Sequence, residues 1–166
     1  MQLKRVLSLS PGPSLVGYAY FEGNRLIDRG IKNNADGPVR WRIFEKGLKI
    51  IGDLADLFEP EIVILPTVED DRRRINRWRF IKAARTILGD RCLILVFCSS
   101  AELKRCFRRM LSERPTVRNV ASSIGEMFPQ VKRLVPRQRR PGGGQDYWTL
   151  MFDAMARWLA WSQRKK

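Results

Sequence analysis

The chain has 166 residues, which fits one domain, and 44% of them are hydrophobic, which is enough for a packed core and excludes a disordered chain. Its 32 Lys and Arg against 17 Asp and Glu give a formal net charge of +15, which favours a polyanionic partner, above all nucleic acid. The complete lack of histidine excludes Ser-His-Asp and Cys-His nucleophile pairs and His-ligated zinc.

The first third of the chain has the pattern of an antiparallel meander. Val6–Ser10, Val16–Glu22 and Arg25–Lys32 are rich in β-branched and aromatic residues and are predicted to be strands. Gly23-Asn24 fits a two-residue hairpin turn with glycine at the first central position. Apolar residues at helical spacing then predict an amphipathic helix over Val39–Phe58.

The remainder alternates strands and helices. The continuous apolar runs Glu61–Leu65 and Leu93–Cys98 predict two strands that are buried on both faces, as in a parallel pairing. Helices are predicted around and after them, at Arg72–Leu88, Ala101–Leu111, Thr116–Phe128 and Gln145–Gln163. Residues 132–144, KRLVPRQRRPGGG, are basic and rich in proline and glycine, and predict a flexible basic loop. The order predicts a single α/β domain with a mixed five-stranded sheet and helices on both faces.

The cysteines and the chain ends bear on the compartment. Cys92, Cys98 and Cys106 form no C-x-x-C pair, which argues against a zinc cluster or a disulfide framework and favours reduced thiols. We find no apolar run of the signal-peptide type and no segment near 18 apolar residues. A cytoplasmic protein with no membrane partner is the prediction.

Several short motifs then occur in a familiar order. LSLSPG at Leu7–Gly12 runs into Val16-Gly17-Tyr18-Ala19, and the strand Ile62–Leu65, the pair Leu103-Lys104 and the sequence Asp153–Ala156 follow. Together they resemble RuvC-type Holliday-junction resolvases, a family of the ribonuclease-H-like superfamily. The resemblance covers nearly the whole chain. It implies a ribonuclease-H-like fold and a surface that binds nucleic acid.

The departures from that family concern its chemistry. The resemblance implies two divalent metals held by four carboxylates, yet Ser10, Pro66 and Leu150 stand at three of the four acid positions. Asp153 is the one acid that remains. Because hard Mg²⁺ takes oxygen ligands, a hydroxyl and one carboxylate make a poor two-metal cage. We therefore expect no catalytic residues, no metal site and no cofactor.

Other acids could replace the missing ones. Asp146 precedes Asp153 by seven residues, about two helical turns, and Glu69, Asp70 and Asp71 follow the strand at 62–65. A relocated cluster of Asp146, Asp153 and one of these acids would hold Mg²⁺ and restore a junction endonuclease. The alternative is structural: Asp70, Asp71 and Asp146 are first-turn or N-cap acids, and Asp153 forms an ordinary ion pair with Arg157.

Basic residues gather in three places. The predicted helix at 72–88 carries little acid to neutralise its cations, which favours a phosphate-binding face over a merely solvated one. The basic loop at 132–144 can follow a phosphate backbone, or act only as a charged linker. A third cluster lies at 104–109 and would be unremarkable alone. The candidate nucleic-acid-binding residues are Arg72, Arg73, Arg74, Arg77, Arg79, Lys82, Lys104, Lys132, Arg133, Arg137, Arg139 and Arg140.

Aromatic residues crowd the last predicted helix. Tyr147, Trp148, Phe152, Trp158 and Trp161 could stack on the bases of a single strand. The stronger interpretation places them in the core and in a subunit interface, because they spread over many faces of the helix.

The sequence thus predicts a catalytically inactive RuvC-like protein, acting as a homodimer, that binds branched or duplex DNA through arginine-rich surfaces. The first alternative is a Mg²⁺-dependent crossover junction endonuclease with rearranged acids. The second is an RNA-binding or assembly module of a nucleoprotein complex.

Overall fold

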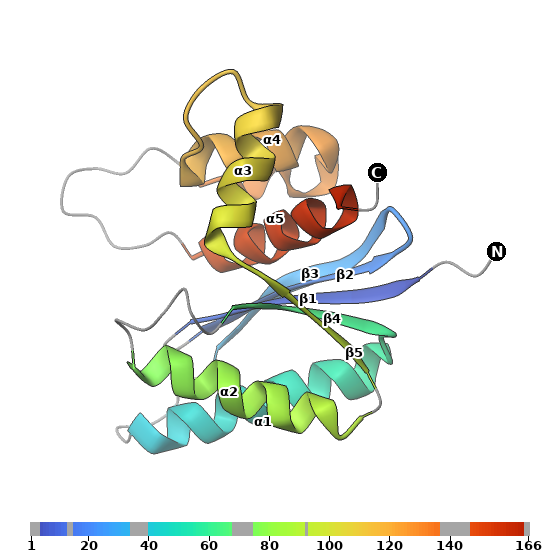
Figure 1. Ribbon diagram of the computed structural model, residues 1–166, viewed down its shortest axis with the longest axis vertical. Coiled ribbons are helices and arrows are strands. Elements are labelled where there is room, and N and C mark those ends of the chain that lie inside the picture. The colour runs from blue at the N-terminus through green and yellow to red at the C-terminus, as the bar shows by residue number, and fades with distance from the viewer. Residues whose placement is uncertain are drawn as a thin grey trace.

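The computed structural model describes residues 4–12, 15–33, 40–67, 75–91, 93–136 and 147–164, and the side chains of 40–44 and 75–78 are left aside. The molecule has three layers, with the sheet in the middle (Figure 1). Helices α1 (Arg40–Phe58) and α2 (Ile75–Gly89) cover one face. The other face carries α3 (Ser100–Met110), α4 (Val117–Met127), the 3-10 helix η2 (Pro129–Leu134) and α5 (Thr149–Gln163).

The sheet is mixed, as the sequence predicts, with the strand order β3-β2-β1-β4-β5. The first three strands form an antiparallel meander, and the last two run parallel to β1. The bounds are β1 Arg5–Pro11, β2 Leu15–Glu22, β3 Arg25–Asn33, β4 Ile62–Pro66 and β5 Ile94–Cys98. The hairpin turn is also confirmed, because Gly23 has a φ of 58°, a conformation open to glycine.

Alternation along β1 divides the molecule into two cores. Leu7 and Leu9 point into the core shared with α1 and α2, whereas Val6 points into the core shared with α5. Ser8 and Ser10 lie on the α5 side and are fully buried. The α5 face of β1 is therefore the only place in the described part of this strand where buried polar side chains occur.

α5 approaches the sheet very closely. A Cβ at Gly17 of β2 would lie 2.3 Å from the carbonyl carbon and oxygen of Leu150, so only glycine fits there. Further along, the Trp158 ring stacks on Phe21 with their centroids 3.9 Å apart. Trp158 and Phe152 are 4% and 2% exposed, which places these two aromatic residues in the core as expected and removes them as base-stacking platforms.

Three details differ from the sequence predictions. β5 is an edge strand, and its Ile94 is 62% exposed. The sequence predicts a strand that is buried on both faces here, because an apolar run alone does not distinguish an edge strand from a central one. α5 begins at Thr149 rather than Gln145, and Asp146 lies outside the described residues. Lys132 and Arg133 belong to η2 rather than to a loop.

Within the described residues, no helix combines the length and the apolar character needed to cross a membrane.

Candidate functional site

Ser10, Asp153 and Arg157 form a closed polar network between β1 and α5. The Ser10 hydroxyl donates a hydrogen bond to Asp153 Oδ2 at 2.5 Å. Arg157 Nε donates to the same oxygen at 3.0 Å, and Nη2 donates to Oδ1 at 3.4 Å. Each carboxylate oxygen of Asp153 therefore has a partner within the protein.

The Arg157 guanidinium also reaches the end of the neighbouring strand. Its Nη1 donates to the carbonyl oxygen of Cys98, the last residue of β5, at 2.5 Å. The Arg157 side chain is 3% exposed, against 28% for Asp153. A buried guanidinium is stable only with a charge partner and with its N–H groups hydrogen-bonded, and this one has both. Arg157 thus links α5 to the carboxyl end of β5.

The four positions that the family resemblance assigns to acids lie near the carboxyl ends of the central strands β1 and β4. Ser10 is near the carboxyl end of β1, and Pro66 ends β4, where it pairs with Cys98 of β5. The pairing of β1 with β4 runs from Val6 and Ile62 to Ser8 and Ile64, so it ends two residues before Ser10 and Pro66. Leu150 lies in the first turn of α5, next to Gly12.

These residues do not fit a two-metal cage. Ser10 supplies only a neutral hydroxyl, and Pro66 and Leu150 supply no side-chain oxygen at all. The remaining carboxylate, Asp153, is already bound to a buried cation. No group of three or more Cys, Asp or Glu side chains able to hold a metal occurs in the part of the chain that the structure describes. Asp153 with its ion pair and the hydroxyl of Ser10 do not amount to the set of carboxylate ligands that two dications require.

The substitute acids stay untested predictions. Glu69, Asp70, Asp71 and Asp146 lie outside the described residues. The predicted pair of Asp153 and Arg157 is confirmed, but it is not the ordinary surface pair that the spacing indicated, because Arg157 is buried.

The cysteines of this region are buried thiols. Cys98 and Cys106 are free, as expected, and Cys92 lies outside the described residues. Burial raises the pKa of Cys98 to about 11, so it stays protonated at neutral pH and is a poor nucleophile.

The α3, α4 and η2 layer has a strongly cationic surface. Its exposed acids, among residues 99–136, are Glu113 and Glu126, while Glu102 is half-buried and pairs with Arg164. We call the exposed cations of this layer the upper cationic surface: Lys104, Arg105, Arg108, Arg109, Arg114, Arg118, Lys132 and Arg133. The sequence predicts that Lys104, Lys132 and Arg133 bind nucleic acid. It does not select the neighbouring arginines as binding residues, because the cluster at 104–109 is unremarkable on a single helix.

The α1 and α2 layer is different. Of its predicted binding residues, Arg79 and Lys82 are exposed, but Phe80, which lies between them, is buried in the core. Cations of this layer also have acidic partners, such as Lys49 with Asp53 and Arg91 with Asp56.

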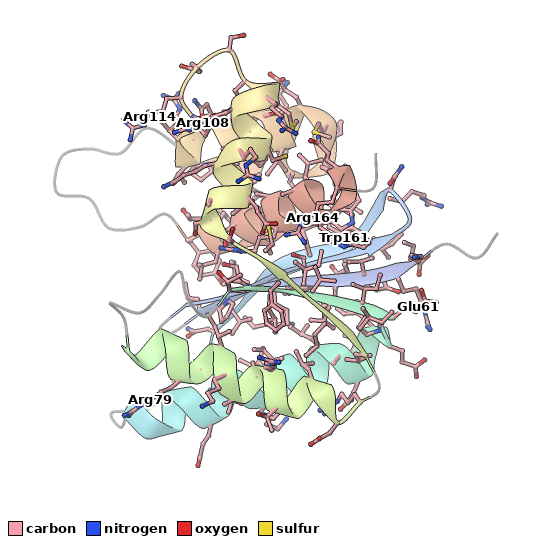
Figure 2. The ribbon with its side chains drawn as sticks, viewed as in Figure 1. Glu61, Arg79, Arg108, Arg114, Trp161 and Arg164 are labelled. Carbon is pink, nitrogen blue, oxygen red and sulfur yellow. The ribbon has the colours of Figure 1, made fainter. Side chains whose placement is uncertain are left out.

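Not every candidate can be placed. Arg72, Arg73, Arg74, Arg137, Arg139 and Arg140 lie outside the described residues, as does the side chain of Arg77. In Figure 2, Arg108 and Arg114 lie at the upper left and Arg79 at the lower left, with the sheet between the two layers.

The strand order and the two helical layers define a ribonuclease-H-like fold, as the sequence predicts. A solved structure of RuvC from Thermus thermophilus superposes with a TM-score of 0.63 at 15% identity, covering 97% of this chain and 96% of that chain. A second, of Thermus thermophilus RuvC in complex with a Holliday-junction substrate, gives a TM-score of 0.60 at 13% identity, covering 95% and 91%. No protein-family model and no curated protein sequence matches the chain.

Sequence reasoning missed two members of the site, Ser8 and the buried role of Arg157. Ser8 donates to the carbonyl oxygen of Ala154 at 2.6 Å and so fixes α5 on β1 one pleat away from Ser10. The available signal was that Asp153 and Arg157 alone carry charge in the otherwise apolar stretch 150–161, which indicates a helix buried on most faces.

Proposed function

We propose that this protein binds nucleic acid through the upper cationic surface and does not cut it. The observation that carries the proposal is the run of exposed cations on α3, α4 and η2 with only Glu113 and Glu126 as exposed acids among them. Arg presents a fork of donors that matches phosphate oxygens, and neutralised phosphates release counterions on binding.

Absence of cleavage follows from the residues between β1 and α5. With Ser10, Pro66 and Leu150 at the acid positions, Asp153 is the single carboxylate there in the described part of the chain, and Arg157 neutralises it. Residues of this kind supply neither a bridge between two metals nor a site for an activated water. The chain therefore acts through recognition of phosphate and shape, with little reading of base sequence.

Branched DNA is the preferred ligand in this proposal. It is supported by the similarity to a RuvC structure that was solved with a Holliday junction, and by the spread of cations over three helical elements rather than one. A junction presents several duplex arms, and a broad basic surface contacts more than one of them. A homodimer would double that surface.

The first experiment measures binding against salt concentration for a four-way junction, a duplex, a single strand and a matched RNA. With six or more phosphate contacts, the logarithm of the binding constant should fall against the logarithm of salt with a slope of about −5 or steeper. We expect the junction to bind most tightly. A slope near zero for every probe would refute nucleic-acid binding, and a preference for RNA would favour the RNA-binding alternative.

A pair of charge-matched variants locates the surface. Arg105→Gln with Arg108→Gln should weaken binding to all sequences alike and reduce the salt slope by about 2, because each phosphate contact adds about one unit. Arg5→Gln with Lys49→Gln removes the same charge from two cations that lie in ion pairs, and should change little. Equal losses in both variants would show that net charge, rather than this surface, drives binding.

Cleavage is tested in the same preparations with Mg²⁺ or Mn²⁺. We expect no product from junctions, flaps or single strands beyond a control without protein. Metal-dependent cutting that Asp146→Asn or Asp153→Asn abolishes would establish the endonuclease alternative. It would overturn the proposal that the protein does not cut nucleic acid.

A further inference from the structure

A pocket of about 230 Å³ lies between α3, α4 and α5, beside Asp153. Its volume is below the roughly 300–1,000 Å³ that is usual for sites of drug-sized ligands, so it suits one flat ring system rather than a chain of groups. Phe107 and Phe152 lie in its wall and are themselves 1% and 2% exposed. The wall is therefore held by the core and is preformed.

The chemistry of the lining is that of a ring-binding site. Leu103, Val120 and Ala156 join the two phenylalanines as apolar walls, and the polar groups are few. Asp153 and Thr149 contribute a carboxylate and a hydroxyl on the α5 side. Because Arg157 neutralises Asp153, the carboxylate offers hydrogen-bond acceptance without a net negative charge that would repel an anion.

The entrance of the pocket belongs to the upper cationic surface. Lys104 is both exposed and part of the lining. Arg114 and Arg118 flank the lining residues 115–117 in sequence, and both are exposed. A ligand that fits this arrangement carries flat, weakly polar rings on a polyanionic backbone.

We propose that this pocket receives one unpaired nucleobase from a strand whose phosphates bind the upper cationic surface. The inference rests on the proposed function and adds a place where a base, rather than only the backbone, is held. Apolar contact with aliphatic lining residues such as Leu103, Val117 and Val120 supplies most of the affinity, so any base enters, while Asp153 and Thr149 favour a base with an exocyclic amino group. Unpaired bases occur in single strands and at the centres of branched DNA.

The test compares a short single-stranded oligodeoxycytidylate, whose bases carry an exocyclic amino group, with an oligonucleotide of the same length in which abasic sites replace the central bases. Both have the same phosphates, so the ratio of their dissociation constants isolates the contribution of the bases. Burial of the apolar surface of one base predicts that the complete strand binds at least about 5-fold more tightly. Equal binding of the two probes, with a steep salt slope, would refute the base pocket and leave nucleic-acid binding intact. Binding of neither probe would refute the proposed function itself.

Filling the pocket locates the effect. Val120→Phe and Val117→Phe each add a ring to the lining, and both should bring the ratio of the two probes close to 1 without changing the salt slope. The matched control is Ile94→Phe, since Ile94 on β5 is 62% exposed, Val117 is 61% exposed, and Ile94 does not line the pocket. Val117→Phe decides the outcome if Val120→Phe unfolds, because Val117 is at the surface.

If the ratio is unchanged in Val120→Phe and Val117→Phe, the base binds elsewhere, and the proposal is overturned. The same result is expected if an apolar side chain of a protein partner is the true occupant.

Discussion

The guanidinium of Arg157 lies between Asp153, one turn earlier on α5, and the carbonyl oxygen of Cys98 at the end of β5. It joins two elements that the sequence separates by 59 positions, and it neutralises Asp153, the only carboxylate at the site among the residues that the structure describes.

Breaking the ion pair from one side should destabilise the fold. Asp153→Ala leaves the Arg157 charge buried without its partner, and should lower the free energy of unfolding by about 3–5 kcal/mol. Arg157→Met with Asp153→Ala should recover most of that loss, because no unpaired charge remains. Denaturant unfolding of the two single variants and the double variant measures the coupling. Strictly additive losses would show that the pair contributes nothing beyond its separate contacts.

Carboxylates introduced at the three positions beside Asp153 should create strong metal binding only when Arg157 is also replaced. Ser10→Asp, Pro66→Glu and Leu150→Asp place carboxylates beside Asp153 at the edge where β1, β4 and α5 meet. The guanidinium competes for those carboxylates, so we expect calorimetry to detect Mn²⁺ binding in the triple variant combined with Arg157→Leu, and much weaker binding when Arg157 is kept. Strong Mn²⁺ binding by the unmodified protein, lost in Asp153→Asn, would contradict our description of the site.

Gly17→Ala should be severe for its size. The new Cβ would meet the backbone of Leu150 at 2.3 Å, and backbone cannot rotate away as a side chain does. Forcing α5 off the sheet should lower the free energy of unfolding by at least about 2 kcal/mol. Gly89→Ala is the control, since its Cβ would meet nothing within 4 Å, and it should be neutral or slightly stabilising. A Gly17→Ala variant as stable as the parent would mean that α5 does not seat as described.

Tyr18 should make the fold sensitive to alkaline pH. Burial raises the pKa of Tyr18 to about 12 from 10.0, and its hydroxyl donates to Asp28 at 3.3 Å. Since the pKa is higher in the folded state, this stabilisation is complete below pH 10 and is lost as the pH rises toward 12; it amounts to about 2 kcal/mol.

The check is the free energy of unfolding against pH. It should fall more steeply between pH 10 and 12 in the parent than in Tyr18→Phe, whose ring cannot ionise. Parallel curves would show that Tyr18 does not carry the effect.

Much of the fold is predictable from the sequence because local patterns determine it. The turn at Gly23, the apolar run of β4 and the helical spacing before Phe58 each identify an element without tertiary information. The edge position of β5 is not visible in this way, because exposure of Ile94 depends on which strand lies beside it.

The position of the site is predictable from the sequence, but the burial of its arginine is not. The resemblance to RuvC-type resolvases implies that Ser10 and Asp153 share one site, and their 2.5 Å hydrogen bond confirms that proximity. Burial of Arg157 was not foreseen, because an arginine four residues after an aspartate also fits a surface pair. The upper cationic surface is only partly visible in the sequence, because α3 carries four of its eight cations and only the fold brings those of α4 and η2 into the same layer.

The contact between Ser10 and Asp153 joins residues that are 143 positions apart, and Ser8 reaches Ala154 across an even longer span. During synthesis on a ribosome, β1 emerges long before α5, and its serine face has no partner until α5 has also emerged. Until then the apolar surface around Val6 and Phe21 is open to water and to other chains. The fold can therefore close only after α5 has emerged, and a nascent chain arrested before α5 should need a chaperone to stay free of aggregation.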